Sequence, residues 1–179
     1  MILGPSKLLQ LVKTKKLVEG LAKRELTNPE GAGFDLRLGE IYKISGKSFL
    51  GIDERHTADI KLVAKFDPKK KNRITIKPGE FYLTKTVEDV NLPDNLTASI
   101  TPRSTLYRSG LFLRTGNVSP GYKGGLTFGL KNEGKVPVTF EMGARFAHIQ
   151  FHEVKGKGKK YRGQWQGGRV TAKRKERQV

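Results

Sequence analysis

The sequence predicts an all-β domain that follows one short helix, and three observations carry this prediction. Strand-like segments recur at short intervals between Pro, Gly, Asn and Asp residues, which is typical of β-sandwiches, jelly rolls and barrels. Sustained helical spacing of apolar residues occurs only near the N-terminus. The chain has 179 residues, 36% of them hydrophobic, so it is long enough to bury a core without cross-links.

The N-terminal helix is expected to begin after the break at Gly4-Pro5, with Ser6 as its N-cap. Residues 8–12 place Leu and Val at helical spacing, and lysines at 13–16 favour the C-terminal end of the helix dipole. This spacing indicates a helix that packs on the domain surface.

The following segments alternate between apolar stretches and turn residues. The predicted strands cover residues 34–38, 41–44, 74–76, 81–83, 87–92, 111–113, 126–130, 136–140 and 146–151. Residues 53–73 are polar and rich in lysine, so we expect an exposed loop or hairpin insertion there.

The charge is large and uneven. There are 35 Lys and Arg against 17 Asp and Glu, a net charge of +18, which favours a polyanionic partner. Residues 154–179 hold ten basic residues and one acidic residue, so 10 − 1 gives +9 in this segment alone. We therefore predict a domain over 1–153 and a basic, Gly-rich arm over 154–179, which serves either solubility or binding. Polymeric nucleic acid is the weaker candidate partner.

Several classes of protein are excluded by composition. There is no cysteine, which excludes a disulfide scaffold, a cysteine zinc site and a thiol nucleophile. No apolar run approaches the roughly 20 residues that span a bilayer, and the N-terminus lacks the uninterrupted apolar segment of a signal peptide. These features predict a soluble, cytoplasmic protein with no membrane partner.

Three segments are too polar and Gly-rich for ordinary core strands. Residues 31–36 place Asp35 at a strand start, where it could bind a metal or a ribose hydroxyl, although a turn-capping role is favoured. Residues 101–110 combine arginines with hydroxyls, which suits a phosphate site or a surface turn. Residues 115–125 indicate a hairpin loop that either brings its backbone and Tyr122 to a ligand or is a plain hairpin.

In this order, these segments and two later ones resemble motifs of the trimeric dUTPase and dCTP deaminase superfamily. The matching stretches are GAGFDLRLG, PRSTL, VSPGYKGGLTFGLKN, GARFAHIQF and YRGQWQG. The resemblance covers most of the chain except residues 45–75 and the last residues. It implies a distorted β jelly roll (the dUTPase-like β-clip), a homotrimer with active sites between subunits, and an arm that closes over the active site. It also implies Mg²⁺ held by the triphosphate, with no direct metal ligand from the protein.

The resemblance also assigns roles to individual residues. Catalytic positions fall on Ser119, Asp35 and Arg108. Binding of the deoxynucleoside triphosphate falls on Arg103, Ser104, Thr105, Gly116, Asn117, Pro120, Tyr122, Lys160, Tyr161, Arg162 and Gln166.

Two departures leave the reaction open. Ser119 stands where the diphosphatases have the Asp that activates water, and Gly129 stands where the deaminases have a proton-shuttling Glu. General acid–base catalysis needs a group with a tunable pKa, which neither residue supplies. His148 replaces the Gln of the fourth motif and is interpreted as an ordinary strand residue. Hydrolysis of dUTP to dUMP and pyrophosphate is the preferred function; deamination of dCTP to dUTP and ammonia, and a non-catalytic nucleotide-binding relative, are the alternatives.

Overall fold

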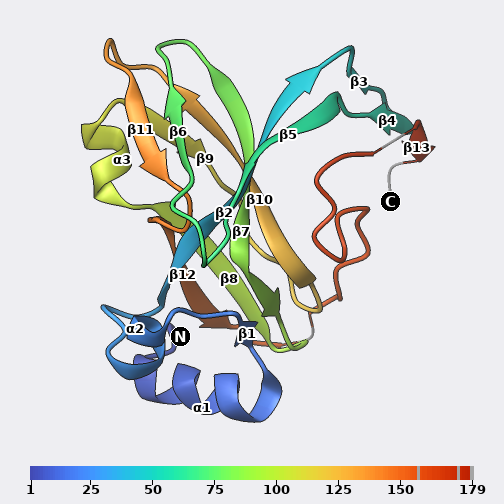
Figure 1. Cartoon of the computed structure of the whole chain (residues 1–179). Helices are drawn as coiled ribbons and strands as arrows, with labels where there is room; N and C mark the ends of the chain where they lie inside the picture. Colours follow the sequence, from blue (N-terminus) through green and yellow to red (C-terminus); the bar gives the residue numbers. More distant parts are fainter. Residues whose placement is uncertain (157, 173, 178–179) are drawn as a thin grey trace.

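Strands dominate the computed structural model, which describes residues 1–156, 158–172 and 174–177 (Figure 1). The helices are α1 (Pro5–Lys15), α2 (Lys23–Thr27) and α3 (Ser104–Arg108). The strands are β1 (Val18–Glu19), β2 (Phe34–Ser45), β3 (Phe49–Leu50), β4 (Glu54–His56), β5 (Asp59–Lys65), β6 (Arg73–Ile76), β7 (Phe81–Asn91), β8 (Leu96–Pro102), β9 (Leu111–Arg114), β10 (Lys123–Asn132), β11 (Val138–Glu141), β12 (Arg145–Glu153) and β13 (Glu176–Arg177). The prediction of an all-β fold with a short N-terminal helix is confirmed.

One large, strongly bent sheet organises the molecule. Its strands run in the order β8-β12-β2-β7-β10-β9, with β1 attached to β7 and β5 to β2. The register shifts between Leu38 and Glu40 where β2 meets β7, and such a bulge increases twist and bends the strand. Gly39 lies at this bulge because a Cβ there would come within 2.7 Å of the carbonyl oxygen of Thr86. The bend lets a single sheet enclose the buried core.

The helices differ in part from the expectation. Helix α1 begins at Pro5 with Gly4 as its N-cap and no side-chain cap bond, so the prediction of Ser6 as N-cap is wrong. Pro suits the first helical turn because the backbone N–H that it lacks has no intrahelical partner there. Helices α2 and α3 have five residues each, too few to show helical periodicity in the sequence. In the described part of the chain, no helix is both long and apolar enough to cross a membrane.

Residues 45–76 contain more regular structure than an exposed loop. Strand β5 joins the large sheet by pairing with the second half of β2, from Ser45↔Asp59 to Glu40↔Lys65. Strands β3 and β4 form a hairpin that pairs with β13 in a separate three-stranded sheet. The expected insertion is therefore a hairpin followed by an edge strand of the main sheet.

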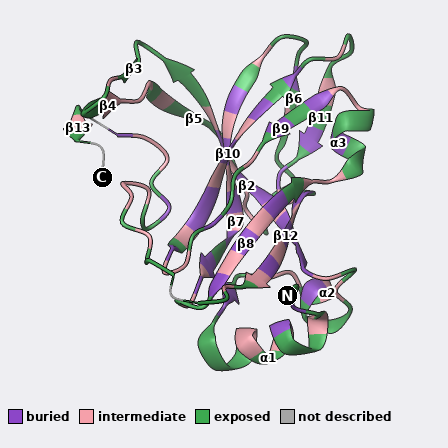
Figure 2. Cartoon of the chain, turned by 180° about the vertical axis from the view of Figure 1, so that it is seen from behind, coloured by how far each residue is buried: buried purple, intermediate pink, exposed green. Residues whose placement is uncertain are grey.

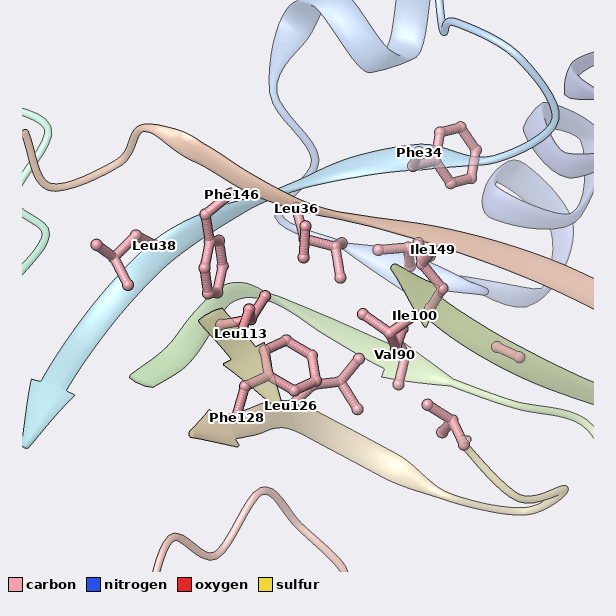
Figure 3. Close-up of a cluster of buried hydrophobic side chains, with 14 of the residues drawn as sticks. Phe34, Leu36, Leu38, Val90, Ile100, Leu113, Leu126, Phe128, Phe146 and Ile149 are labelled. Atoms are coloured by element: carbon pink, nitrogen blue, oxygen red, sulfur yellow. The ribbon is translucent and has the colours of Figure 1, made fainter. Parts of the chain in front are cut away.

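The core fills the interior of the bent sheet, where the purple, buried positions of Figure 2 concentrate. Phe34, Phe146 and Phe151 are fully buried, and Figure 3 shows Phe146 and Phe128 facing each other from β12 and β10. The ring centroids of Phe128 and Phe146 are 5.9 Å apart. Fully burying such a side chain contributes about 1.5–3 kcal/mol, so these rings fix the relative position of the two strands that carry the third and fourth motifs.

Candidate functional site

A cavity of about 300 Å³ lies between the loop at 115–122, strand β10 and the arm, which we define as the described residues of 154–177. Its lining residues are Gly116, Asn117, Val118, Ser119, Tyr122, Leu126, Thr127, Phe128, Tyr161, Trp165, Arg169 and Val170. We call it the tyrosine cavity. Aromatic rings, a few polar side chains and backbone together give it the mixed character of a small-molecule site.

The loop that forms one wall is held at both ends. Val118 exchanges two backbone hydrogen bonds with Ala98 of β8, with N···O distances of 2.8 and 3.0 Å. The N–H of Tyr122 donates to the carbonyl of Ser119 at 3.2 Å, and Gly121 has a φ of 77°. Pro followed by a Gly with positive φ is the sequence that a type II turn requires. The sequence Ser-Pro-Gly-Tyr thus presents Ser119 and Tyr122 from one rigid turn.

Tyr122 is the buried side chain at the centre of the cavity wall. Its hydroxyl donates to the carbonyl of Gly125 at 2.8 Å. Burial, followed by the proximity of Tyr161 and Asp89, raises the pKa of Tyr122 to about 12. The phenol therefore stays neutral at physiological pH and offers a flat ring to a ligand.

Thr127 carries an unusual polar atom. Its Oγ1 is buried and has no hydrogen-bond partner among the described residues, although Thr127 lines the cavity. A buried hydroxyl without a partner lowers the free energy of unfolding by about 1–3 kcal/mol. Such groups are therefore normally hydrogen-bonded to protein, to an ordered water or to a ligand. Thr127 thus places an unpaired hydroxyl at the wall of this cavity.

The arm closes the opposite side of the tyrosine cavity through bonds to the loop. The N–H of Tyr161 donates to the carbonyl of Pro120 at 2.7 Å. Gln166 accepts a hydrogen bond from the N–H of Lys123 and donates to the carbonyl of Gly121, both at 3.0 Å. Backbone groups of the loop are therefore bonded to the backbone of Tyr161 and to the side chain of Gln166.

A second group of charges surrounds Asp35, whose side chain is 2% exposed. Arg103 and Arg145 donate to its Oδ2, the latter at 2.8 Å, and His148 Nδ1 lies 3.0 Å from its Oδ1. Arg24 lies 3.7 Å from the same carboxylate. Burial acts most strongly and would raise the pKa of Asp35, but the His148 hydrogen bond and the charges of Arg103 and Arg145 together lower it below its usual value. Asp35 is thus a carboxylate that holds the side chains of Arg103 and Arg145 in position.

Arg103 and Arg145 also line a second cavity, of about 400 Å³, which we call the arginine cavity. Thr105 and Ser109 of the α3 region lie in its wall beside apolar residues of β9 and β11. The two cavities share no lining residue. Within one chain, the two arginines and the aromatic wall thus belong to separate cavities.

The residues expected to bind or act on a ligand fall into three groups. The tyrosine cavity brings together Gly116, Asn117, Ser119, Tyr122 and Tyr161. Arg103 and Thr105 line the arginine cavity, whereas Ser104 and Arg108 lie exposed on α3 outside both linings. Pro120 and Gln166 join the loop to the arm, Lys160 pairs with Asp94 at 2.9 Å, and Arg162 is exposed on the arm.

Some lining residues were not among those expected. Thr127, Arg169 and Val170 belong to the wall of the tyrosine cavity, as does Trp165, which lies within the C-terminal motif. A single Thr inside the apolar stretch of residues 126–130 is the signal that could have identified Thr127. The two residues of the arm after the motif carry no such signal.

Neither cavity has an Asp or Glu in its lining. At Gly129, an added Cβ would lie 3.1 Å from the ring of Phe81, so a side chain at this position would require the ring to shift by a few tenths of an ångström. In the part of the chain that the structure describes, no three His, Cys, Asp or Glu residues converge to hold a metal ion.

The sequence profile of the dCTP deaminase-like family matches residues 2–154. The chain belongs to this family. A dCTP deaminase of Pyrococcus furiosus is 30% identical to this dCTP deaminase-like chain over 169 residues, 94% of this chain and 96% of the relative. A probable deoxyuridine 5'-triphosphate nucleotidohydrolase of Methanothermobacter thermautotrophicus is 32% identical over 142 residues, 79% of this chain and 89% of the relative. The resemblance inferred from the five motifs is confirmed.

Solved structures place the dCTP deaminase-like chain in the expected fold. The 2'-deoxycytidine 5'-triphosphate deaminase of Agrobacterium tumefaciens aligns with a TM-score of 0.65 at 20% identity over 84% of this chain, which spans 48% of that structure's length. The D95N dUTPase of phage phi11 of S. aureus, in which a structural Mg(II) ion is coordinated, aligns with a TM-score of 0.51 at 16% identity, covering 80% of this chain and 94% of that one. The dUTPase-like fold is therefore confirmed.

Proposed function

We propose that this protein binds a deoxypyrimidine nucleoside triphosphate and hydrolyses dUTP to dUMP and pyrophosphate. The single observation that carries the proposal is the tyrosine cavity, whose wall joins the ring of Tyr122, the loop backbone at 116–119 and the orphaned hydroxyl of Thr127. A base and deoxyribose need an aromatic surface and a few polar contacts, which this wall offers. Relatives named as dCTP deaminases and as a probable dUTP nucleotidohydrolase support the same substrate class.

The triphosphate would lie against arginine side chains. Guanidinium forks match phosphate oxygens, and Arg103 and Arg145 are partly exposed on the arginine cavity while Asp35 orients them. Because the two cavities of one chain share no residue, we propose that a homotrimer sets the arginines of one copy against the tyrosine cavity of the next. Exposed Arg108 on α3 would then be available to the neighbouring copy.

In the proposed reaction, a water oxygen attacks the α-phosphorus. One P–O bond forms, the bond to the oxygen between the α and β phosphorus atoms breaks, and the water proton leaves with pyrophosphate or solvent. Ser119, exposed at the cavity, would orient this water by a hydrogen bond, because a hydroxyl cannot act as a base near neutral pH unaided. Arg103 would stabilise the charge that develops on the phosphate oxygens.

Magnesium would enter with the substrate, as the Mg²⁺ complex of the triphosphate, and would neutralise part of its charge. The donor set of the chain fits this arrangement, since neither cavity is lined by a carboxylate. Mg²⁺ commonly keeps several waters and binds substrate phosphates with few protein ligands.

The geometry favours hydrolysis over deamination. Attack at C4 of cytosine needs a proton shuttle beside the base, and Gly129 supplies none while Phe81 occupies the adjacent space. Hydrolysis depends more on charge stabilisation and positioning, which the arginines can provide.

One assay tests the proposal. The purified protein is incubated with Mg²⁺ and either dUTP or dCTP, and pyrophosphate and ammonia are both followed, with Tyr122→Ala as the variant that removes the cavity wall. We expect pyrophosphate from dUTP, no ammonia from dCTP, and loss of turnover in the variant. Ammonia from dCTP would establish the deaminase instead. A nucleotide-induced rise in Tm without either product would leave a non-catalytic binding protein.

A further inference from the structure

Two segments far apart in the sequence, both outside the family motifs, pack against each other. Strand β13, beyond residue 154 where the family match ends, pairs with β4 of the β3–β4 hairpin in the register Glu176↔Arg55 and Arg177↔Glu54. Figure 1 shows β13 beside β4, with the red arm running between this sheet and the end of β10. We call residues 49–58 the latch hairpin.

Arg55 of the latch hairpin reaches the wall of the tyrosine cavity. Its Nε donates to Oε1 of Gln164, and its guanidinium carbon lies 5.6 Å from the ring centroid of Trp165. Trp165 lines the cavity. Arg55, which is not a lining residue itself, therefore contacts a side chain that lines the cavity.

Glu176 of β13 ties both flanks of Trp165 to the small sheet. One carboxylate oxygen accepts a hydrogen bond from Nε2 of Gln164 at 2.7 Å, and the other lies 2.6 Å from Nη2 of Arg169. Arg169 also lines the cavity. Both partners flank the tryptophan in sequence, so the carboxylate restricts the turn that presents its ring.

A third set of bonds fastens the arm just after the cavity. The hydroxyls of Thr57 and Thr171 are 2.7 Å apart, and the N–H of Ala172 donates to Oγ1 of Thr57 at 2.9 Å. Thr171 also donates to the carbonyl of Ala58 at 2.8 Å. Ala172 is 2% exposed, so this junction is a packed contact.

We propose that the latch hairpin holds the arm closed over the tyrosine cavity without any ligand, and that Arg55 is the positioning residue for Trp165. The bonds above run directly from the hairpin and β13 to the residues on both sides of Trp165. Release of the latch would then open the arm side of the cavity and speed the entry and exit of a ligand. The latch stands on contacts of the free protein, whereas its effect on nucleotide exchange rests on the proposed function.

The latch is tested first on the free, full-length protein by hydrogen exchange and by the fluorescence of Trp165, the single tryptophan. We expect slow exchange at residues 161–172 in the wild type. Arg55→Ala should raise exchange there at least about tenfold and shift the emission to longer wavelength, while β2 and β10 keep their protection. Arg114→Ala is the matched control. Arg114 also places its guanidinium over an aromatic ring, that of Phe112 at 5.9 Å, but both residues belong to β9 and not to the arm.

Two results would overturn the latch. One is exchange at 161–172 in the wild type as fast as in an unprotected peptide; the other is an Arg55→Ala protein with unchanged exchange and emission. If Arg55→Ala also loses protection in β10, Thr57→Val decides by the same criteria, since it removes only the hydroxyl that holds residues 171 and 172.

Nucleotide exchange is then measured by stopped-flow quenching of Trp165 with dUTP. We expect Arg55→Ala to raise the association and dissociation rates together, by about the same factor. A protein that binds no dUTP would refute the proposed function but leave the hydrogen-exchange result valid. Rates that stay unchanged in a variant with a freed arm would show that the latch does not gate the cavity.

Discussion

The ring of Tyr161 meets the ring of Tyr122 edge to face, with centroids 5.3 Å apart and an angle of 79° between planes. One ring belongs to the arm and the other to the turn at the start of β10. Because the backbone N–H of Tyr161 also bonds the turn at Pro120, the arm completes the cavity wall in the same chain. The cavity and its cover thus form one packed unit.

Replacing Asp35 by Asn should lower the unfolding free energy at pH 7 by about 3 kcal/mol, because it leaves Arg103 and Arg145 without their buried partner. Folding lowers the pKa of Asp35 below its ordinary value of 3.8. Its stabilisation is therefore full above that value and is lost as the pH falls through the lower folded pKa. Urea unfolding at pH 7, 5 and 3 should show a steeper acid loss in the wild type than in the variant.

Asp53→Asn is the control for this experiment, because Asp53 is exposed. The stability of this variant should depend on pH as that of the wild type does. Parallel stability curves for wild type and Asp35→Asn would show that Asp35 carries none of the acid dependence.

Thr127→Val should leave stability unchanged or raise it by up to about 1 kcal/mol, since it removes an unpaired buried hydroxyl. Affinity for dUTP should fall roughly two- to tenfold through loss of one hydrogen bond. Thr84→Val is the matched control: its hydroxyl bonds the carbonyl of Phe128 at 3.3 Å, so we expect lower stability with unchanged affinity. Calorimetry measures the affinity for dUTP, and thermal unfolding measures the stability. A Thr127→Val protein that is less stable but binds dUTP normally would show that Thr127 is not part of the ligand site.

Ser119→Asp should raise pyrophosphate release from dUTP, because it places a carboxylate base at the cavity. Ser119→Asn, similar in shape but without a basic oxygen, should not. Equal rates in the two variants would mean that the water is activated elsewhere.

The Gly124→Ala substitution should displace the arm. Gly124 has a φ of +117°, and an added Cβ would lie 2.5 Å from the backbone nitrogen of Gly168. Gly156 has a φ of +89° with nothing within 4 Å, so Gly156→Ala adds strain without the clash. We expect only the first to shift the emission of Trp165; identical spectra would contradict the packing of arm against β10.

Arg103→Ala and Tyr122→Ala should each lose dUTP hydrolysis. If copies share sites as proposed, refolding the two variants together should restore about a quarter of the wild-type activity. In randomly mixed trimers, about one site in four combines an intact Arg103 from one copy with an intact Tyr122 from the next. No recovery would place both residues in a site built from one chain.

Periodicity predicted β12, but it divided β2 and β7 into two segments each, although both are continuous strands. The buried face of β7 includes Thr84, Thr86 and Glu88, which interrupt the apolar pattern that periodicity detects. Strand β8 is not predicted, since one of its three buried residues is Ala98, whose small side chain gives a weak apolar signal. Helix α3 is a single short turn inside a polar motif and has no periodicity to detect.

The motif order predicted which residues lie near a ligand, but not how they divide between cavities. Arg103 and Tyr122 are brought to different cavities by the bend of the sheet, which depends on contacts far apart in sequence. The docking of the arm depends on Arg55 and Thr57 in a segment without a family motif, so no local pattern could predict it.

The pairing of β4 with β13 also makes the two segments depend on each other for backbone hydrogen bonds. A two-stranded hairpin is marginal alone and leaves an open edge, so β3–β4 gains its third strand only from the end of the arm. Loss of either segment would leave the other with exposed, unpaired backbone. Removing either segment is therefore expected to destabilise the other.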